Sequence, residues 1–188
     1  DFGSAMVVAL LWLGMSLVAG ISKKHIFIVL SAIVIIFSVS WLFLFKPYQK
    51  ARVISFIDPT SDIRGAGYNA YQSVIAVGSG GILGKGLGYG TQSRLNFLPE
   101  YQTDFVFAAF SEEWGFLGSL VVLFCFSFLL WRIKVHAEHG ASNFETLFCV
   151  GYFIFLFGHL VVNIGMNIGV MPVTGIPLPF MSYGGSHI

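Results

Sequence analysis

The chain has 188 residues, of which 56% are hydrophobic and only 10% are charged, and its formal net charge is +1. A soluble domain carries roughly 25% charged residues, so this chain lacks the polar side chains to cover itself in water. The small net charge, without a basic stripe, gives no basis for a nucleic acid partner. We therefore expect an integral membrane protein that contacts membrane lipids.

Four apolar stretches, in chain order, predict helices that cross a membrane. They cover roughly residues 3–21, 25–45, 104–131 and 146–169. A helix needs about 20 apolar residues to cross the hydrocarbon core. The stretches do not alternate as the strands of a membrane β-barrel do. We therefore predict an all-α fold, a polytopic transmembrane helical bundle that forms a single membrane domain with a long external loop.

The two ends of the chain predict that it is part of a larger protein. Asp1 stands directly before an apolar run, without Met, a basic segment or the cleavage site of a signal peptide. The last residues, SYGGSHI, stop where a further apolar run is expected to begin. We interpret the chain as an interior piece of a larger membrane protein.

Basic residues near the predicted spans indicate the orientation. The loop SKKH joins the first two spans, and WRIKVHAEHG follows the third. Short loops rich in Lys and Arg stay in the cytoplasm, and four consecutive spans place these two loops on the same side. We therefore expect an external loop at 46–103 and an external Pro/Gly loop at 171–186. The long loop holds six of the ten basic residues, but the rule gives most weight to short loops.

The expected external loop has two distinct parts. Its start, KPYQKARVISF, suits a short amphipathic helix at the membrane interface. The later stretch SVIAVGSGGILGKGLGYGTQ is rich in glycine, yet it matches neither a Walker motif nor a dinucleotide-binding fingerprint. Two interpretations stay open for it. It is a flexible connector, or its backbone approaches a ligand closely, with Lys85 in the middle.

Four of the nine acidic residues gather around the start of the third predicted span: Glu100, Asp104, Glu112 and Glu113. A carboxylate at mid-bilayer costs about 2.5–3.5 kcal/mol, so this clustering requires a reason. In a helix that runs from residue 104, Asp104 and Glu112 share one half of the surface and Glu113 points nearly opposite Asp104. For Glu112 and Glu113, pairing with a bundle neighbour or with a helix end is an equal alternative to a functional role. Glu100 by itself is expected to be a solvated acid on the protein surface.

Asp104 has two open interpretations. Aspartate at the start of a helix is a good N-cap. An acid that faces a cavity within a membrane protein is a functional candidate. If burial raises its pKa modestly, it is also a competent general base.

Polar residues on the fourth span and the Pro/Gly loop complete the pattern. His159, Asn163 and Asn167 recur at i, i+4 and i+8 with glycines nearby, which favours close helix packing over a proton relay. The segment GIPLPFMSYGGS is not expected to be helical. Irregular backbone at membrane depth survives only where protein surrounds it or lines a cavity, so we place this loop against the same external cavity as Asp104.

Several ordered motifs resemble one family. The stretch GAGYNAYQSVIAVGSGGILGKGLGYGTQSRLNFLPEYQTDFVFAAFSEEWGFLG is similar to the signature external loop and following span of the SEDS family, the RodA/FtsW proteins. MPVTGIPLPFMSYGGS resembles the family's late Pro-Gly loop, and DFGSAM resembles the end of its Gln-Pro-Asp-x-Gly motif. The resemblance covers the whole chain, and DPTSDIRGAGYNAYQS is closer to the RodA branch.

The resemblance implies the C-terminal half of a bacterial peptidoglycan glycosyltransferase of the cytoplasmic membrane. Such enzymes polymerise lipid II at the outer face of that membrane, here during cell-wall elongation, with a class B penicillin-binding protein as partner. The essential aspartate of the family falls on Asp104, which implies the general base. The expected substrate-binding residues are Lys85, Arg52, Glu100 and Glu112. No cofactor is implied with certainty, and a divalent cation stays open.

Two other classes of function stay open beside this one. A lipid II flippase would use the same cavity without bond chemistry. A membrane scaffold of the wall-synthesis complex would need no titrating carboxylate.

Overall fold

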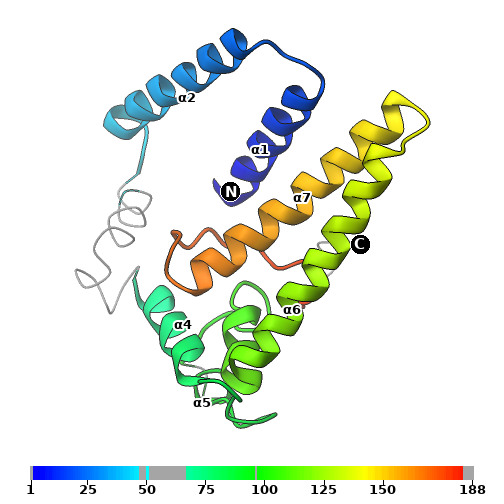
Figure 1. Cartoon of the computed structure of the whole chain (residues 1–188). Coiled ribbons are helices and arrows are strands. Elements are labelled where there is room, and N and C mark those ends of the chain that lie inside the picture. Colours follow the sequence, from blue (N-terminus) through cyan, green and yellow to red (C-terminus); the bar gives the residue numbers. More distant parts are fainter. Residues whose placement is uncertain (1, 47–49, 51–66, 96, 184–188) are drawn as a thin grey trace.

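The computed structural model describes residues 2–46, 50, 67–95 and 97–183, and these residues form helices and irregular segments without a strand (Figure 1). The helices are α1 (Phe2–Val18), α2 (Lys23–Phe43), α4 (Tyr68–Ser79), α5 (Thr91–Arg94), α6 (Val106–Glu138) and α7 (Asn143–Asn167). The all-α fold expected from the sequence is confirmed.

Three helices among the described residues are long and apolar enough to cross a membrane: α2, α6 and α7. Helix α1 is equally apolar in character but has only 17 residues. It ends at Val18, so the span expected at 3–21 is shorter as a helix. The predicted crossing by α1, and with it the fourth span, stays a prediction.

Helices α6 and α7 form an antiparallel pair joined by a tight turn (Figure 1). Ser142 stands at the N-cap of α7 and its hydroxyl accepts the N–H of Glu145 at 3.3 Å, while the Glu145 carboxylate accepts the N–H of Ala141 at 2.7 Å. This reciprocal arrangement resembles a capping box and explains why α7 begins at Asn143. The apolar core of the pair contains Phe107, Phe126, Leu130, Ile133, Leu156, Leu160 and Leu178.

Helix α1 packs against α7 through glycines, whereas α2 stands apart (Figure 1). A Cβ on Gly14 would overlap the side chain of Ile154, and a Cβ on Gly151 would lie 3.3 Å from the sulfur of Met15. Small residues allow such close helix contacts in membranes. In α2, none of its most apolar window is buried.

Helix α6 begins later and is less regular than the sequence suggested. It starts at Val106 and is broken at Gly115, where φ is 67° and ψ is −164°. The assumption of one continuous helix from residue 104 is therefore wrong. Asp104 lies before the helix, so the angle expected between Asp104 and Glu112 on a helical surface does not apply.

The glycine-rich segment 80–90 supplies hydrogen-bond partners to the backbone groups at the break in α6. In an unbroken helix, the N–H groups of residues 116 and 117 would bond to the carbonyls of 112 and 113. Here the loop replaces each partner: Lys85 N and Gly86 N donate to Glu112 O and Glu113 O (both 3.0 Å), and Phe116 N and Leu117 N donate to Gly81 O and Ile82 O (2.9 and 3.1 Å). All four backbone groups are thus satisfied, as a membrane environment requires.

Close backbone approach explains the glycines at this contact. Gly84 has φ +81°, and a Cβ there would overlap the backbone of Glu113. Gly80 comes equally close to the backbone of Ser111. The backbone of this stretch approaches α6 closely, and a close approach to a ligand stays a prediction. The amphipathic helix expected after residue 46 falls mostly outside the described residues.

Candidate functional site

The clustered carboxylates have separate surroundings. Glu112 is buried inside the protein, Glu113 is half-buried, and Glu100 is exposed. Asp104 is half-buried in the turn that precedes α6. The four clustered carboxylates thus differ in their exposure to solvent.

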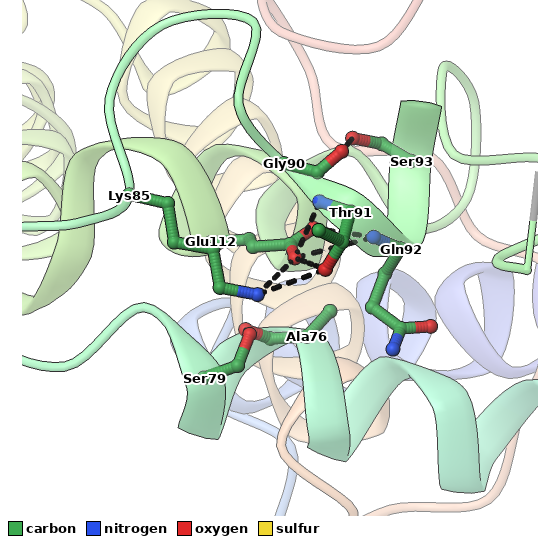
Figure 2. Close-up of polar contacts among 8 residues, drawn as sticks. All are labelled: Ala76, Ser79, Lys85, Gly90, Thr91, Gln92, Ser93 and Glu112. Carbon is green, nitrogen blue, oxygen red and sulfur yellow. Dashed lines mark hydrogen bonds and ion pairs between the residues drawn. The ribbon is translucent and has the colours of Figure 1, made fainter. Parts of the chain in front are cut away.

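Glu112 is held by donors from the glycine-rich loop and from α5. Lys85, Thr91 and Gln92 converge on its carboxylate (Figure 2). The Lys85 Nζ lies 2.7 Å from Oε1, the N–H and hydroxyl of Thr91 donate to Oε1 at 2.9 Å each, and the N–H of Gln92 donates to Oε2 at 3.1 Å. The Glu112 side chain is 0% exposed and that of Lys85 is 29% exposed.

These contacts give Glu112 a structural role, which is to connect the glycine-rich loop and α5 to α6. A buried carboxylate is tolerable when it is paired and hydrogen-bonded, and Glu112 also accepts the free N–H groups at the start of α5. The ion pair and these bonds fasten the loop and α5 to α6. Pairing with a neighbour and a helix end, one of the alternatives for Glu112, is what the structure shows. Contact of Lys85 or Glu112 with substrate stays a prediction.

Removing Lys85 is expected to destabilise the protein more than removing the charge of Glu112. Lys85→Met leaves a fully buried carboxylate without its cation, which costs about 3–5 kcal/mol. Glu112→Gln leaves a lysine that still reaches water, so the loss is nearer to that of one hydrogen bond to a charged group, about 1.5–3 kcal/mol. Thermal unfolding of the detergent-solubilised protein measures both.

The double variant is the control for that comparison. Lys85→Met combined with Glu112→Gln is expected to be more stable than Lys85→Met alone, since no unpaired charge remains buried. Additive losses would contradict the pairing.

A tight turn presents Asp104 just before α6. Glu100 has a left-handed backbone (φ 52°), and its carbonyl accepts the N–H groups of Thr103 and Phe105 at 3.1 and 3.2 Å. The N-cap of α6 is Phe105, without a side-chain cap bond. Asp104 therefore does not cap the helix, and its carboxylate accepts no hydrogen bond from a residue that the structure describes.

The Pro/Gly loop lies against this turn. A Cβ on Gly175 would lie 3.4 Å from Asp104 Oδ2. The Ser182 hydroxyl donates to the carbonyl of Thr103 at 2.6 Å. The loop and Asp104 thus share one neighbourhood, as expected from the sequence.

A pocket of about 480 Å³ opens beside the turn. Its walls include Gln102, two positions before Asp104, and Val106, two positions after it. The half-buried Glu113 also lines the pocket. The full lining is Ser93, Tyr101, Gln102, Val106, Ala109, Phe110, Glu113, Met181 and Tyr183. A polar ligand with an apolar part suits such a mixed wall.

Burial raises the pKa of Asp104 above the usual value of an aspartate, and the negative charge of Glu100 raises this pKa further. Asp104 precedes the span-length helix α6, so it titrates outside that segment. A raised pKa makes a carboxylate a stronger base in its ionised form. The surroundings thus favour a proton acceptor at Asp104.

The connection of Asn163 and Asn167 with Asp104 is not apparent from the sequence, where the spacing of the two asparagines indicates helix packing. Both side chains are fully buried, and both donate to the backbone carbonyl of Asp104, at 2.9 and 3.2 Å. Their i, i+4 spacing on an apolar helix was the only signal.

The remaining predicted site residues are less informative here. Arg52 lies outside the described residues. Within the described ranges, no group of three or more His, Cys, Asp or Glu side chains is placed to hold a metal ion. A divalent cation therefore stays an open prediction.

Fold and site together define a class: a helical integral membrane protein in which a turn with a half-buried acid follows a glycine-rich loop in the chain and lies against a Pro/Gly loop. The profile of the FtsW/RodA/SpoVE family, described as cell cycle proteins, matches residues 1–188. The chain belongs to this family, the SEDS family that its motifs resemble.

Named relatives span both branches of the family. The chain is 42% identical over its whole length to peptidoglycan glycosyltransferase MrdB of Escherichia coli K12, covering 51% of that protein. It is 45% identical to peptidoglycan glycosyltransferase RodA of Treponema pallidum, over 76% of this chain and 33% of that one. It is 40% identical over its whole length to a probable peptidoglycan glycosyltransferase FtsW of Thiomicrospira cyclica, covering 48% of it.

A solved structure is also similar. It is described as "Structural coordination of polymerization and crosslinking by a peptidoglycan synthase complex", with a TM-score of 0.78 and 32% identity, covering 100% of this chain and 51% of that one. The chain thus spans about half the length of several relatives that it matches.

Proposed function

We propose that the protein containing this chain is a peptidoglycan glycosyltransferase that polymerises lipid II into glycan strands, with Asp104 as general base. The observation that carries the proposal is the position of Asp104. Asp104 is half-buried and caps no helix, and its carboxylate lies against Gly175 of the Pro/Gly loop. The turn that carries it contributes Gln102 to the wall of a pocket. The names of the relatives support the reaction class.

The proposed reaction needs one base and one stabilised leaving group. Asp104 takes the proton of the acceptor sugar's 4-hydroxyl as that oxygen attacks the anomeric carbon of the donor. The bond from this carbon to the lipid diphosphate breaks, and the diphosphate leaves with the bonding electrons. Attack from the opposite face turns an α-linked donor into a β-1,4 link. Proton removal by one carboxylate typically contributes about 10²–10⁴-fold.

Basic side chains are proposed to bind the diphosphate of the donor. Arg52 and Lys85 are the candidates, and Glu100 and Glu112 complete the proposed substrate-binding set. Because Lys85 already pairs with Glu112 at 2.7 Å, its ammonium would have to serve both partners. A substrate contact at Lys85 is thus coupled to the stability of the loop.

The proposed setting is the bacterial cytoplasmic membrane, with Asp104 on the outer side and a class B penicillin-binding protein as partner. Support for the partner comes from the similar structure, which describes a complex for polymerisation and crosslinking. A role in elongation is proposed from the RodA-like stretch before α4.

Reconstitution of the full-length protein with purified lipid II tests the proposal. Glycan strands are the expected product. Translocation of lipid II without polymer would favour a flippase, and neither activity with the partner present would favour a scaffold. Each result points to a different class of protein.

Neutralising Glu100 is expected to move the pH dependence of the reaction. The base must be ionised, so kcat/KM rises with pH through the pKa of Asp104. The Glu100 charge raises this pKa, and Glu100→Gln therefore shifts the acid limb to lower pH. Lipid II polymerisation measured across pH checks this. The exposed Glu138 at the opposite end of α6 is the control, because Glu138→Gln should leave the acid limb in place.

A further inference from the structure

The carboxamide of Asn167 takes the place of a helical hydrogen bond at the start of α6. Its Oδ1 accepts the N–H of Ala108 at 3.0 Å, and its Nδ2 donates to the carbonyl of Asp104 at 3.2 Å. These two backbone groups are four residues apart and would bond to each other in an α-helix. Asn167 stands between them, so the turn stays open and Asp104 stays outside α6.

Asn163 holds the same carbonyl from a second direction. Its Nδ2 donates to Asp104 O at 2.9 Å and to Ile176 O at 2.8 Å. Asn163 thereby ties the Asp104 backbone to the Pro/Gly loop, whose Gly175 faces the Asp104 carboxylate. The side-chain amides of Asn163 and Asn167 thus hold the Asp104 carbonyl, and Asn163 also holds the Pro/Gly loop.

The network is buried and closed. Both asparagine side chains are 0% exposed. Ser73 of α4, also buried, donates to the Asn167 backbone carbonyl at 2.8 Å, and Asn167 Nδ2 donates to Asn163 O at 2.7 Å. Buried, fully satisfied polar networks hold one arrangement, because breaking any member leaves an unsatisfied group. Such a network is more than helix packing requires.

We propose that Asn167 and Asn163 are positioning residues, which set the backbone of Asp104 and so aim its carboxylate at the reacting sugar hydroxyl. This inference rests on the proposed function. Neither asparagine touches substrate; each acts through Asp104. A carboxamide suits the task because it carries both a donor and an acceptor, which an aliphatic side chain of similar size does not.

The test uses Asn167→Leu in the full-length protein with its partner and lipid II. Without the carboxamide, Ala108 N–H and Asp104 O can bond directly, which winds Asp104 into α6, while Asn163 Oδ1 loses the donor that it has at 3.2 Å. We expect the protein to fold, KM to stay near that of the wild type, and kcat to fall by about 10²-fold, the effect of misplacing a catalytic group by roughly 1 Å. Asn143→Leu, at the exposed start of the same helix, is the matched control and should keep its kcat.

Asn163→Leu gives a second, independent test. It keeps the Asn167 bridge but removes both donor bonds from Asn163, and we again expect a fall in kcat with little change in KM. If both variants fold with wild-type kcat, or if only KM rises, the positioning role is wrong. Activity lost only in proportion to folded protein, measured by thermal unfolding, would also overturn it in favour of a structural role. A wild-type protein that makes no glycan would instead refute the proposed function itself.

Discussion

Asp104→Asn in the full-length protein is expected to abolish glycan polymerisation while folding and partner binding stay intact. Asparagine is nearly isosteric with aspartate but accepts no proton, so the loss should be about 10²–10⁴-fold, the usual contribution of a general base. Folding should survive because the Asp104 side chain accepts no bond from the described residues, and its backbone carbonyl still accepts from Asn163 and Asn167. The rate of lipid II polymerisation with the purified partner is the measurement.

Glu113→Gln is the matched control for that experiment. Glu113 is also a half-buried acid and lines the adjacent pocket, so the variant removes one charge from the same neighbourhood. Its effect on the chemical step should be smaller. Glycan production by Asp104→Asn at a near wild-type rate would show that Asp104 is not the base.

Gly84→Ala is expected to cause the largest loss of stability among single glycine variants in the loop. A Cβ at this position would overlap the carbonyl of Glu113, which accepts the N–H of Gly86 across the break in α6. Moving the loop away leaves buried backbone groups unsatisfied, at about 1–3 kcal/mol each. We expect a loss of about 3 kcal/mol or more, seen as a lower melting temperature and a lower yield of folded protein.

Gly88→Ala separates backbone strain from packing. Gly88 also has a positive φ (+74°), but a Cβ there meets nothing within 4 Å. Its variant should lose only the price of a left-handed backbone, about 1–2 kcal/mol. Equal losses in the two variants would mean that the loop does not depend on its close contact with α6.

The sequence alone determined the class of fold, because that class depends on local composition. Long apolar runs have one stable form in lipid, a helix whose backbone groups bond within the segment. The start of α7 also depends on local contacts, because Ser142 and Glu145 are three residues apart and cap the helix, although the predicted span began at residue 146. The family motifs around Asp104 were likewise legible in the printed residues.

The tertiary structure decided where α6 breaks and what the carboxylates do. Glycine permits the backbone of residue 115, but the break persists because residues 81–86 supply the four missing partners. Glu112 and Lys85 are 27 residues apart, and Asn167 and Asp104 are 63 apart. Hydrophobic periodicity reports which face of one helix is apolar, whereas these bonds depend on which segments meet. These long-range contacts give Glu112 its role in attaching the glycine-rich loop to α6, and they keep Asp104 outside the helix.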